Sequence, residues 1–247
     1  MVVNNKIILI TGAAVGGIGE AVANYYADNN EIIVSSKNMT PDRISSTNLA
    51  IAADCMTEEG IKYLETEILK KYNKIDVLIN CIGGSLGNSE FEEITLEFFE
   101  KVISLNLTSS FLLSQMASRL MSNVEKGWIT HIVSSSGFQP EVKKIPYAVA
   151  KAGQVHLIRS LALVLAPKII VNGVSPTYVY TDRHLAEIKT KAEETNVSEK
   201  EIMENYVSKQ IVPNYLYPDD LIEFIDLSIT TKVMTGKILH ATGGRVL

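Results

Sequence analysis

A tyrosine and a lysine four positions apart, Tyr147 and Lys151, are residues whose types and spacing suit proton transfer. Residues with this spacing lie on one face of a helix, so the Lys151 ammonium can stand near the Tyr147 phenol. A free tyrosine has a pKa near 10, and a neighbouring cation lowers it. Tyr147 would then protonate an oxygen that becomes negatively charged, or accept the proton in the reverse direction. A helical tyrosine more often only packs against apolar neighbours, so the pair needs support from other residues.

A glycine-rich turn near the N-terminus is suited to a phosphate group. The apolar run 7–11 leads directly into TGAAVGGIGEAVANYY. Such a turn presents backbone N–H groups and a helix N-terminus to an anion, and side chains at Gly12, Gly17 or Gly19 would obstruct that approach. Alone, the pattern also fits a merely structural turn. As the first turn of an alternating β/α chain, it predicts a dinucleotide site.

With these two motifs the sequence resembles the short-chain dehydrogenase/reductase family, whose glycine motif is TGxxxGxG. This chain has one residue more in the loop, so Gly16 or Gly17 could hold the middle position. We assign Gly17, because Gly17, Ile18 and Gly19 then open the helix. The segments VNGVSPTYVYT and TGKILHATGG resemble the family's VNxVxPGxVxT and TGxxxxxDGG segments. The resemblance therefore covers nearly the whole chain.

The resemblance implies a catalytic set of Asn106, Ser134, Tyr147 and Lys151. Ser134 lies thirteen positions before Tyr147, as in the family's Ser–Tyr–Lys pattern, and its hydroxyl would bond the substrate carbonyl. Its neighbours Ser135 and Ser136 fit that spacing less well. Asn106 would bond backbone and hold a water that links Lys151 to solvent, although an asparagine in a helix can also be a tolerated polar residue.

The resemblance also implies contacts with a nicotinamide dinucleotide. Asp54 matches an adenine-contacting aspartate, and residues 80–83 match an NNAG segment in which Cys81 and Ile82 replace Asn and Ala. Val179 and Thr181 would approach the nicotinamide half. The expected cofactor-binding residues are Gly12, Gly17, Ile18, Gly19, Ser36, Lys37, Asp54, Asn80, Gly83, Tyr147, Lys151, Val179 and Thr181.

The residues at the end of the second expected strand select between NAD and NADP, because an acidic residue there bonds the ribose hydroxyls of NAD. This chain reads IIVSSKN at that point. Ser36 and Lys37 would bond and neutralise a 2′-phosphate, and no carboxylate is present in this stretch to repel one. The sequence favours NADP(H) over NAD(H), although Lys37 also reads as an ordinary exposed lysine.

Apolar runs of strand length alternate with stretches of helical periodicity, which predicts an α/β fold. We expect a Rossmann-type, doubly wound, parallel seven-stranded sheet with helices on both faces. The expected strands span 7–11, 32–36, 49–53, 77–81, 129–134, 169–174 and 237–241, and the expected helices 19–29, 58–72, 96–121, 147–165 and 219–229. No linker or repeat divides residues 1–247, which predicts one domain. The charged segment 181–212 predicts one or two helices, either a solvated surface or a lid over a substrate pocket.

Composition excludes several other classes of protein. The chain has 247 residues, a net charge of −5 and 46% hydrophobic residues, and its lysines and arginines are scattered; we expect a folded, soluble protein that does not bind nucleic acid. The two cysteines, Cys55 and Cys81, lack metal-ligand spacing; we expect reduced core residues and no metal. The N-terminal run reads as a buried strand rather than a signal peptide, and no apolar run approaches membrane-spanning length. The expected location is the cytoplasm.

Within the family, IVPNYLYPDDL and TGKILHATGG look most like 3-oxoacyl-[acyl-carrier-protein] reductases. That resemblance implies NADPH-dependent reduction of a carbonyl. If the carbonyl is carried on an acyl carrier, Lys143, Lys144, Arg183 and Lys189 would supply a basic rim for this acidic partner. The alternative is an NAD(P)-dependent dehydrogenase of a small alcohol, sugar or polyketide-like intermediate. A cofactor-binding sensor would be expected to lack an intact catalytic set.

The family usually forms dimers or tetramers through its two long helices, and FLLSQMASRLM would suit such a face.

Overall fold

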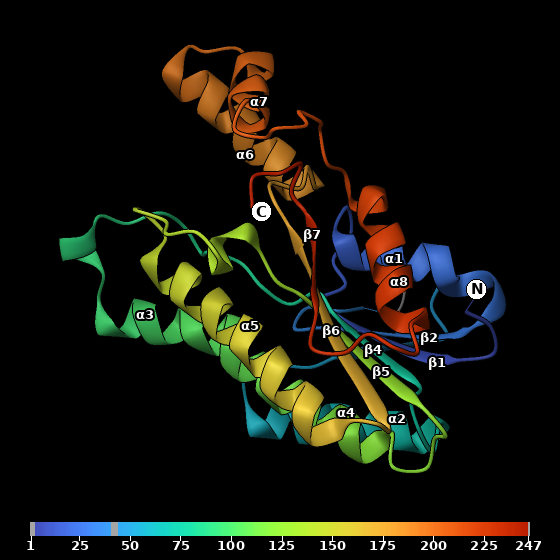
Figure 1. Ribbon diagram of the computed structural model, residues 1–247. Helices are drawn as coiled ribbons and strands as arrows, with labels where there is room; N and C mark the ends of the chain where they lie inside the picture. The colour runs from blue at the N-terminus through green and yellow to red at the C-terminus, as the bar shows by residue number, and fades with distance from the viewer. Residues whose placement is uncertain (1–2, 41–43, 247) are drawn as a thin grey trace.

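Seven parallel strands form one sheet in the order β3-β2-β1-β4-β5-β6-β7 (Figure 1). The computed structural model describes residues 3–40 and 44–246. The strands are β1 (Ile7–Thr11), β2 (Glu31–Ser36), β3 (Leu49–Ala52), β4 (Val77–Asn80), β5 (Gly127–Ile132), β6 (Ile169–Pro176) and β7 (Ile238–Ala241). Chain order reverses between β1 and β4. In open α/β sheets, ligands bind beyond the carboxyl ends of the strands at such a reversal.

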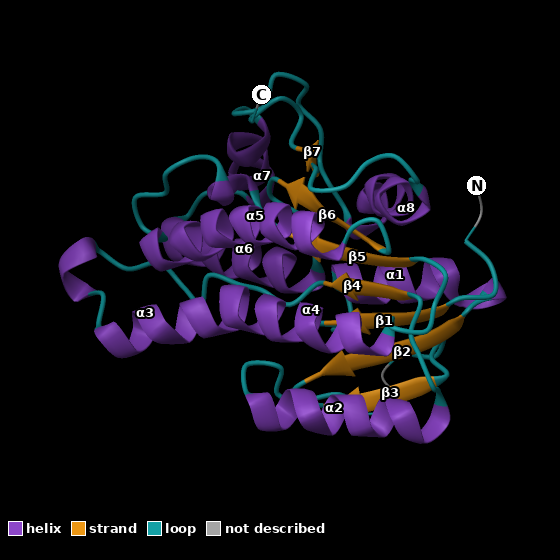
Figure 2. Ribbon diagram, turned by 60° about the horizontal axis from the view of Figure 1, so that its bottom comes forward, coloured by secondary structure: helices purple, strands orange, loops and turns teal. Residues whose placement is uncertain are grey.

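Helices cover both faces of the sheet, as Figure 2 shows. One face carries α1 (Ile18–Tyr26) and α8 (Ile222–Thr230), and the other carries α2 (Glu58–Lys71), α3 (Leu96–Ile103), α4 (Ser109–Leu120) and α5 (Ile145–Leu165). Short 3₁₀ turns occupy Ala27–Asn29, Phe91–Glu93, Ser135–Gly137 and Pro218–Leu221. The predicted doubly wound fold is confirmed.

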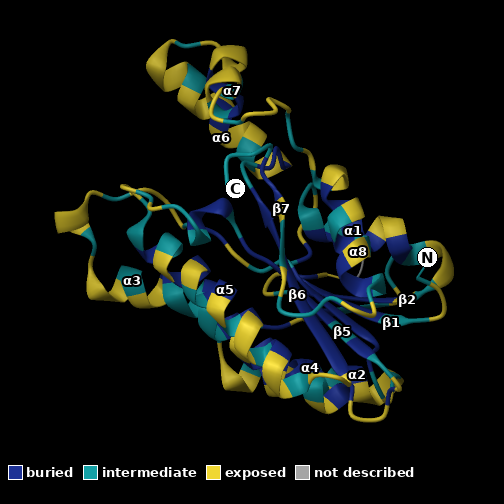
Figure 3. Ribbon diagram, in the orientation of Figure 1, coloured by how far each residue is buried: buried dark blue, intermediate teal, exposed yellow. Residues whose placement is uncertain are grey.

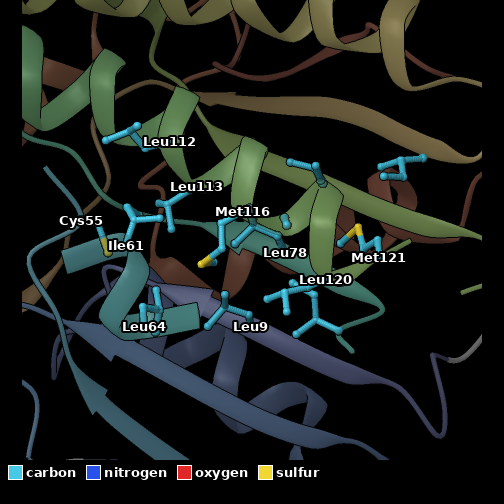
Figure 4. Close-up of a cluster of buried hydrophobic side chains, with 14 of the residues drawn as sticks. Leu9, Cys55, Ile61, Leu64, Leu78, Leu112, Leu113, Met116, Leu120 and Met121 are labelled. Carbon is cyan, nitrogen blue, oxygen red and sulfur yellow. The ribbon is translucent and has the colours of Figure 1, made fainter. Parts of the chain in front are cut away.

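The strands are apolar almost without interruption because both of their faces are buried. On one face, Leu9 and Leu78 pack against Ile61 and Leu64 of α2 and against Met116 of α4 (Figure 4). Their neighbours along the same strands turn to the opposite face, where they meet α1 and α8. This two-sided burial produces continuous apolar runs rather than an alternating pattern.

The expected helix 96–121 is wrong as a single α-helix. A wider π turn, Ser104–Thr108, separates α3 from α4. Within that turn the Asn106 amide donates to the carbonyl of Val102, and the Ser109 and Ser110 hydroxyls donate to the carbonyls of Leu105 and Asn106. Polar side chains that bond the backbone in this way compete with regular helical geometry. The local widening coincides with the residue expected to be catalytic.

Segment 181–212 contains two helices, α6 (Asp182–Thr195) and α7 (Glu199–Val207). Thr181 and Ser198 cap their N-termini by accepting from His184 N and Glu201 N. The helices stand apart from the sheet and are largely exposed (Figures 1 and 3). A separate small cluster holds them, formed by Tyr180, Ile188 and Ile202.

Among the described residues, α5 is the one helix long and apolar enough to cross a bilayer by length and composition, with a mean hydropathy of 1.3. This corrects the expectation that no such run exists. The helix packs against the sheet through Val155, Ile158 and Ala162 and buries the charged Lys151. These contacts identify α5 as a core helix of this fold.

Candidate active site

A cavity of about 410 Å³ lies beyond the carboxyl ends of β1, β4, β5 and β6. Its volume falls in the range typical of small-molecule sites. The glycine turn after β1 forms one end, and the region around Ser134, Tyr147 and Lys151 forms the other. The phosphate-binding and chemical motifs of the sequence therefore lie in one pocket.

Close backbone contacts explain two glycines of the turn. Gly12 has φ +72, and a Cβ there would lie 2.6 Å from the backbone of Cys81 and Ile82. A Cβ at Gly19 would lie 2.6 Å from the Cα of Ala13. Gly17 is the N-cap of α1, and Ile18 is its first residue. The turn thus leaves the amino end of α1 open toward the pocket, as a bound anion requires.

The additional residue of the glycine turn is held by one carboxylate and by one backbone N–H group. Gly16 has φ +67, and its N–H donates to Oε2 of Glu20 at 2.6 Å. Its carbonyl accepts from Asp182 N at 3.1 Å, and a Cβ at Gly16 would collide with the Asp182 side chain. The extra glycine therefore joins the turn to the start of α6. Glu20 and Asp182 were not predicted as site residues, and the one sequence signal for them is the additional glycine of the turn.

Lys151 is buried, with 2% of its surface exposed. Its ammonium donates to the carbonyl of Ile132 and to Oε1 of Gln154, both at 2.9 Å, and lies 5.7 Å from the centre of the Tyr147 ring. Burial disfavours the charged form and lowers the pKa of Lys151 to about 7. This lysine can therefore exchange a proton near neutral pH.

The pKa of Tyr147 differs from the sequence-based expectation. Burial is the main influence and raises this pKa above its usual value, while a hydrogen bond to Ser134 and the charge of Arg183 act in the lowering direction. Lys151 is not among the groups that lower the pKa of this phenol. The expected lowering of the Tyr147 pKa is therefore wrong in direction, and burial raises this pKa instead.

The three consecutive serines after β5 differ in their surroundings. Ser134 is half-buried, lines the pocket, and lies close enough to Tyr147 to lower the pKa of its phenol. Ser135 is buried, and the Ser136 hydroxyl donates to Glu141 at 3.1 Å. Of the three serines, Ser134 is the one whose hydroxyl meets the Tyr147 phenol.

Asn106 lies fully buried in the π turn, and its amide group bonds both the N–H and the carbonyl of Gly84. A Cβ at Gly83 would lie 2.9 Å from Asn106 Oδ1 and 3.0 Å from Lys151 Nζ. Gly83 therefore permits the asparagine and the lysine to approach the same point. The predicted bonding of Asn106 to backbone is present.

A buried chain of polar side chains extends from Lys151 into the sheet, and of its members only Lys151 and Asn80 were predicted from the sequence. Gln154, which accepts from Lys151, donates to the hydroxyl of Ser110 at 2.7 Å. Asn80 donates to the same hydroxyl and to Nδ1 of His131, each at 3.1 Å. Burial and the Lys151 charge lower the pKa of His131 to about 3, so this histidine is neutral. Asn80 thus lies behind the pocket wall.

The residues expected at the adenine end bond each other. Lys37 Nζ lies 2.7 Å from Asp54 Oδ2, with 63% of the lysine side chain exposed, and this contact lowers the pKa of Asp54. Ser36 ends β2 beside Ala52 of β3. None of these residues lines the 410 Å³ cavity.

Three more of the predicted residues line the cavity, whereas Gly19, Asn80 and Asn106 are not among its lining residues. Val179 and Thr181 follow β6, and Gly83 follows β4. Cys81, expected in the core, also reaches the pocket, whereas Cys55 is buried. Among residues 3–40 and 44–246, no group of His, Cys, Asp and Glu could hold a metal ion.

Comparisons with known proteins agree with this geometry. The family model of short chain dehydrogenases matches residues 6–192. The NAD-dependent glycerol dehydrogenase of Listeria innocua is 30% identical, over 98% of this chain and 94% of that protein. A 3-oxoacyl-[acyl-carrier-protein] reductase of Aquifex aeolicus is 27% identical, over 97% and 96%. A short chain dehydrogenase family protein from Francisella tularensis has a structure with a TM-score of 0.86 and 25% identity, covering 98% of both chains.

A dinucleotide-type turn and a Tyr–Lys pair in one pocket of a Rossmann-type sheet define a nicotinamide-dependent oxidoreductase acting on alcohol or carbonyl groups. The chain belongs to the short-chain dehydrogenase family.

Proposed function

We propose that this enzyme reduces a carbonyl group to a hydroxyl with NADPH, using Tyr147 as the general acid. The observation that carries the proposal is the convergence of Ser134, Tyr147 and Lys151 in the pocket whose opposite end is the glycine turn. A phenol whose pKa is raised by burial is protonated at neutral pH. It is therefore ready to donate a proton, which is the requirement of the reductive direction.

The pocket suits a nicotinamide dinucleotide, because the glycine turn brings the N-terminus of α1 to the cavity wall. The close backbone contacts at Gly12 and Gly19 fix the turn in that position. We assign the pyrophosphate to the turn formed by Gly12, Gly17, Ile18 and Gly19, at the N-terminus of α1. Gly83, Val179 and Thr181 would border the nicotinamide half. When bound, the cofactor supplies the hydride. Asn80 would support this wall from behind through its buried bonds.

Proton transfer follows from the side chains of the chemical end. Ser134 would donate a hydrogen bond to the carbonyl oxygen and stabilise its developing negative charge. Tyr147 would give its proton to that oxygen, and Lys151, with its pKa near 7, would assist return of a proton to the phenol. Asn106 would hold the loop at Gly84 in place and order a water beside Lys151.

The preference for NADPH rests on Ser36 and Lys37 at the end of β2, where the stretch 31–38 has no carboxylate after Glu31. The 2.7 Å contact with Asp54 holds the lysine at the edge of strands β2 and β3. A 2′-phosphate would compete with Asp54 for this ammonium, and Asp54 would then be available to the adenine.

A 3-oxoacyl thioester, free or on an acyl carrier, is the first substrate class, because the Aquifex reductase shares 27% identity over nearly the full chain. Oxidation of a small polyol is the second, and the 30% identical glycerol dehydrogenase supports it. Oxidation of NADPH and NADH should be followed with acetoacetyl thioesters, ketones and sugars, and reduction of NADP and NAD with glycerol. Activity only in the alcohol-oxidising direction, or only with NAD, would contradict the first proposal.

We also propose a homodimer or homotetramer formed through α4 and α5. Both helices expose large apolar side chains, among them Phe111, Val149, Leu163 and Val164 at 46 to 86% exposure. A second copy would bury them. Light scattering should give twice or four times the mass of 27.2 kDa, and a monomer at micromolar concentration would contradict this.

A further inference from the structure

Cationic side chains gather around the chemical end of the pocket. Besides Lys151, the cavity is lined by Lys144, Arg183, Lys209 and Arg245, against a single carboxylate, Glu141. The whole chain has a net charge of −5. This local excess of positive charge is therefore opposite in sign to the protein as a whole, and it would attract an anion.

Arg245 is fixed beside the serine loop rather than beside the glycine turn. Its backbone carbonyl accepts from the Gln139 amide, and its guanidinium lies 3.8 Å from Glu141. Glu141 in turn accepts from the Ser136 hydroxyl, two residues after Ser134. The C-terminal tail thus places a cation near the proposed position of the carbonyl.

Lys209 reaches the pocket from the neighbouring segment. It follows α7 and precedes a stretch in which Val212 N donates to the carbonyl of Gly243 at 2.9 Å. The segment after α7 and the C-terminal tail therefore run side by side, and Figure 1 shows the C-terminus near α6 and α7. Among the described residues, no carboxylate lies within ion-pair distance of Lys209 or Lys144.

Lys144 and Arg183 add charge on the catalytic side. Lys144 is the residue before α5, three positions ahead of Tyr147. The charges of Lys144 and Arg183 both act to lower the pKa of His184. The charge of Arg183 also acts to lower the pKa of Tyr147. The glycine turn has Glu20 and Asp182 as its charged neighbours instead. The turn binds phosphate through backbone N–H groups, so pyrophosphate binding there does not account for cations at the opposite end.

We propose that the carbonyl substrate carries an anionic group, a carboxylate or a phosphate, which Lys209 and Arg245 bind while its carbonyl oxygen meets Tyr147 and Ser134. Lys144 and Arg183 contribute to the same positive field. This inference rests on the proposed carbonyl reduction and specifies the class of its substrate. It differs from recognition of an acyl carrier by an outer rim, because the cations line the cavity itself.

The test compares ketones that differ only in charge. Acetoacetate is paired with methyl acetoacetate for the carboxylate, and dihydroxyacetone phosphate with dihydroxyacetone for the phosphate. We expect kcat/KM with NADPH to be at least about tenfold higher for the anionic member of one pair, through a lower KM, and the advantage to shrink with added salt. The pair that shows the advantage identifies the anionic group.

Variants then locate the effect. Arg245→Gln and Lys209→Gln should each reduce the anion-to-neutral ratio of kcat/KM by about fivefold or more. Lys209 is exposed, so its replacement leaves the core intact should Arg245→Gln fold poorly. Lys200→Gln is the matched control. The Lys200 side chain lies on α7 and is 82% exposed, so this substitution should leave the ratio unchanged.

A neutral ketone that is reduced as well as its anionic partner in both pairs overturns this inference and leaves carbonyl reduction standing. An advantage that survives both pocket variants also overturns it. If no ketone of either charge is reduced with NADPH or NADH, the proposed function itself fails, and the inference fails with it.

Discussion

The two ends of the pocket are built from different parts of the chain. At the glycine turn, backbone atoms and missing side chains create the site, since a Cβ at Gly12 or Gly19 would meet backbone at 2.6 Å. At the chemical end, buried side chains create it, and Lys151 depends on Gln154 and the Ile132 carbonyl. Substitution should therefore affect binding at the first end and proton transfer at the second.

The largest expected effect separates these two functions. Tyr147→Phe should reduce turnover by about a thousandfold, because the general acid is removed while the ring remains. The glycine turn is untouched, so the dissociation constant of NADPH should change by less than about threefold. Stopped-flow turnover and fluorescence titration measure the two quantities. Retained turnover would assign the proton to another group.

Ser134→Ala tests which hydroxyl stabilises charge at the chemical end. We expect a loss of about 10- to 100-fold in kcat, because one oxyanion donor disappears. Ser135→Ala and Ser136→Ala are matched controls that should each cost less than about threefold in kcat. The opposite ranking would move the role to Ser135 or Ser136.

The strands and the placement of Tyr147 and Lys151 on one helix were predictable from the sequence for a physical reason. Two-sided burial makes each strand a short apolar run, and the Tyr147–Lys151 spacing is local to one helix. The polar chain from Gln154 through Ser110 and Asn80 to His131 was not predictable, because it joins residues 30 to 51 positions apart. The π turn also contains a distant contact, because its Asn106 bonds the backbone of Gly84, 22 positions away. Desolvation of Tyr147 likewise arises only from packing, so charge proximity alone gave the wrong direction for its pKa.

The stability of the chemical end should depend on pH through Lys151. Its folded pKa of about 7 lies below its unfolded value of about 10.4, so between these values the unfolded chain binds the additional proton. The free energy of unfolding, relative to Lys151→Met, should therefore rise by about 2 kcal/mol from pH 7 to pH 9. Urea denaturation at both pH values measures this. A constant difference would mean that the lysine is not desolvated in the fold.

Gly12→Ala tests the phosphate end in the same way. The new Cβ would meet the backbone of Cys81 and Ile82 and would also force a side chain onto φ +72. We expect about 2 kcal/mol of destabilisation and loss of measurable NADPH binding. Gly87→Ala is the control, since Gly87 has φ +127 but nothing within 4 Å of its Cβ position. Comparable loss of binding in both variants would point to backbone strain rather than to the close contact.

The smallest effect concerns the choice of cofactor at the outer edge of the phosphate end. Lys37→Ala should raise the KM of NADPH by about three- to fivefold and that of NADH by less than twofold, since an exposed ion contact contributes below about 1 kcal/mol. Asp54→Asn removes the competing carboxylate from Lys37, so the ratio of NADH to NADPH KM values should rise in that variant and fall in Lys37→Ala. Steady-state kinetics with both cofactors measures the two ratios. If both variants shift the ratio in the same direction, Lys37 does not bind the 2′-phosphate. The phosphate end of the pocket would then recognise only the pyrophosphate, which NAD and NADP share.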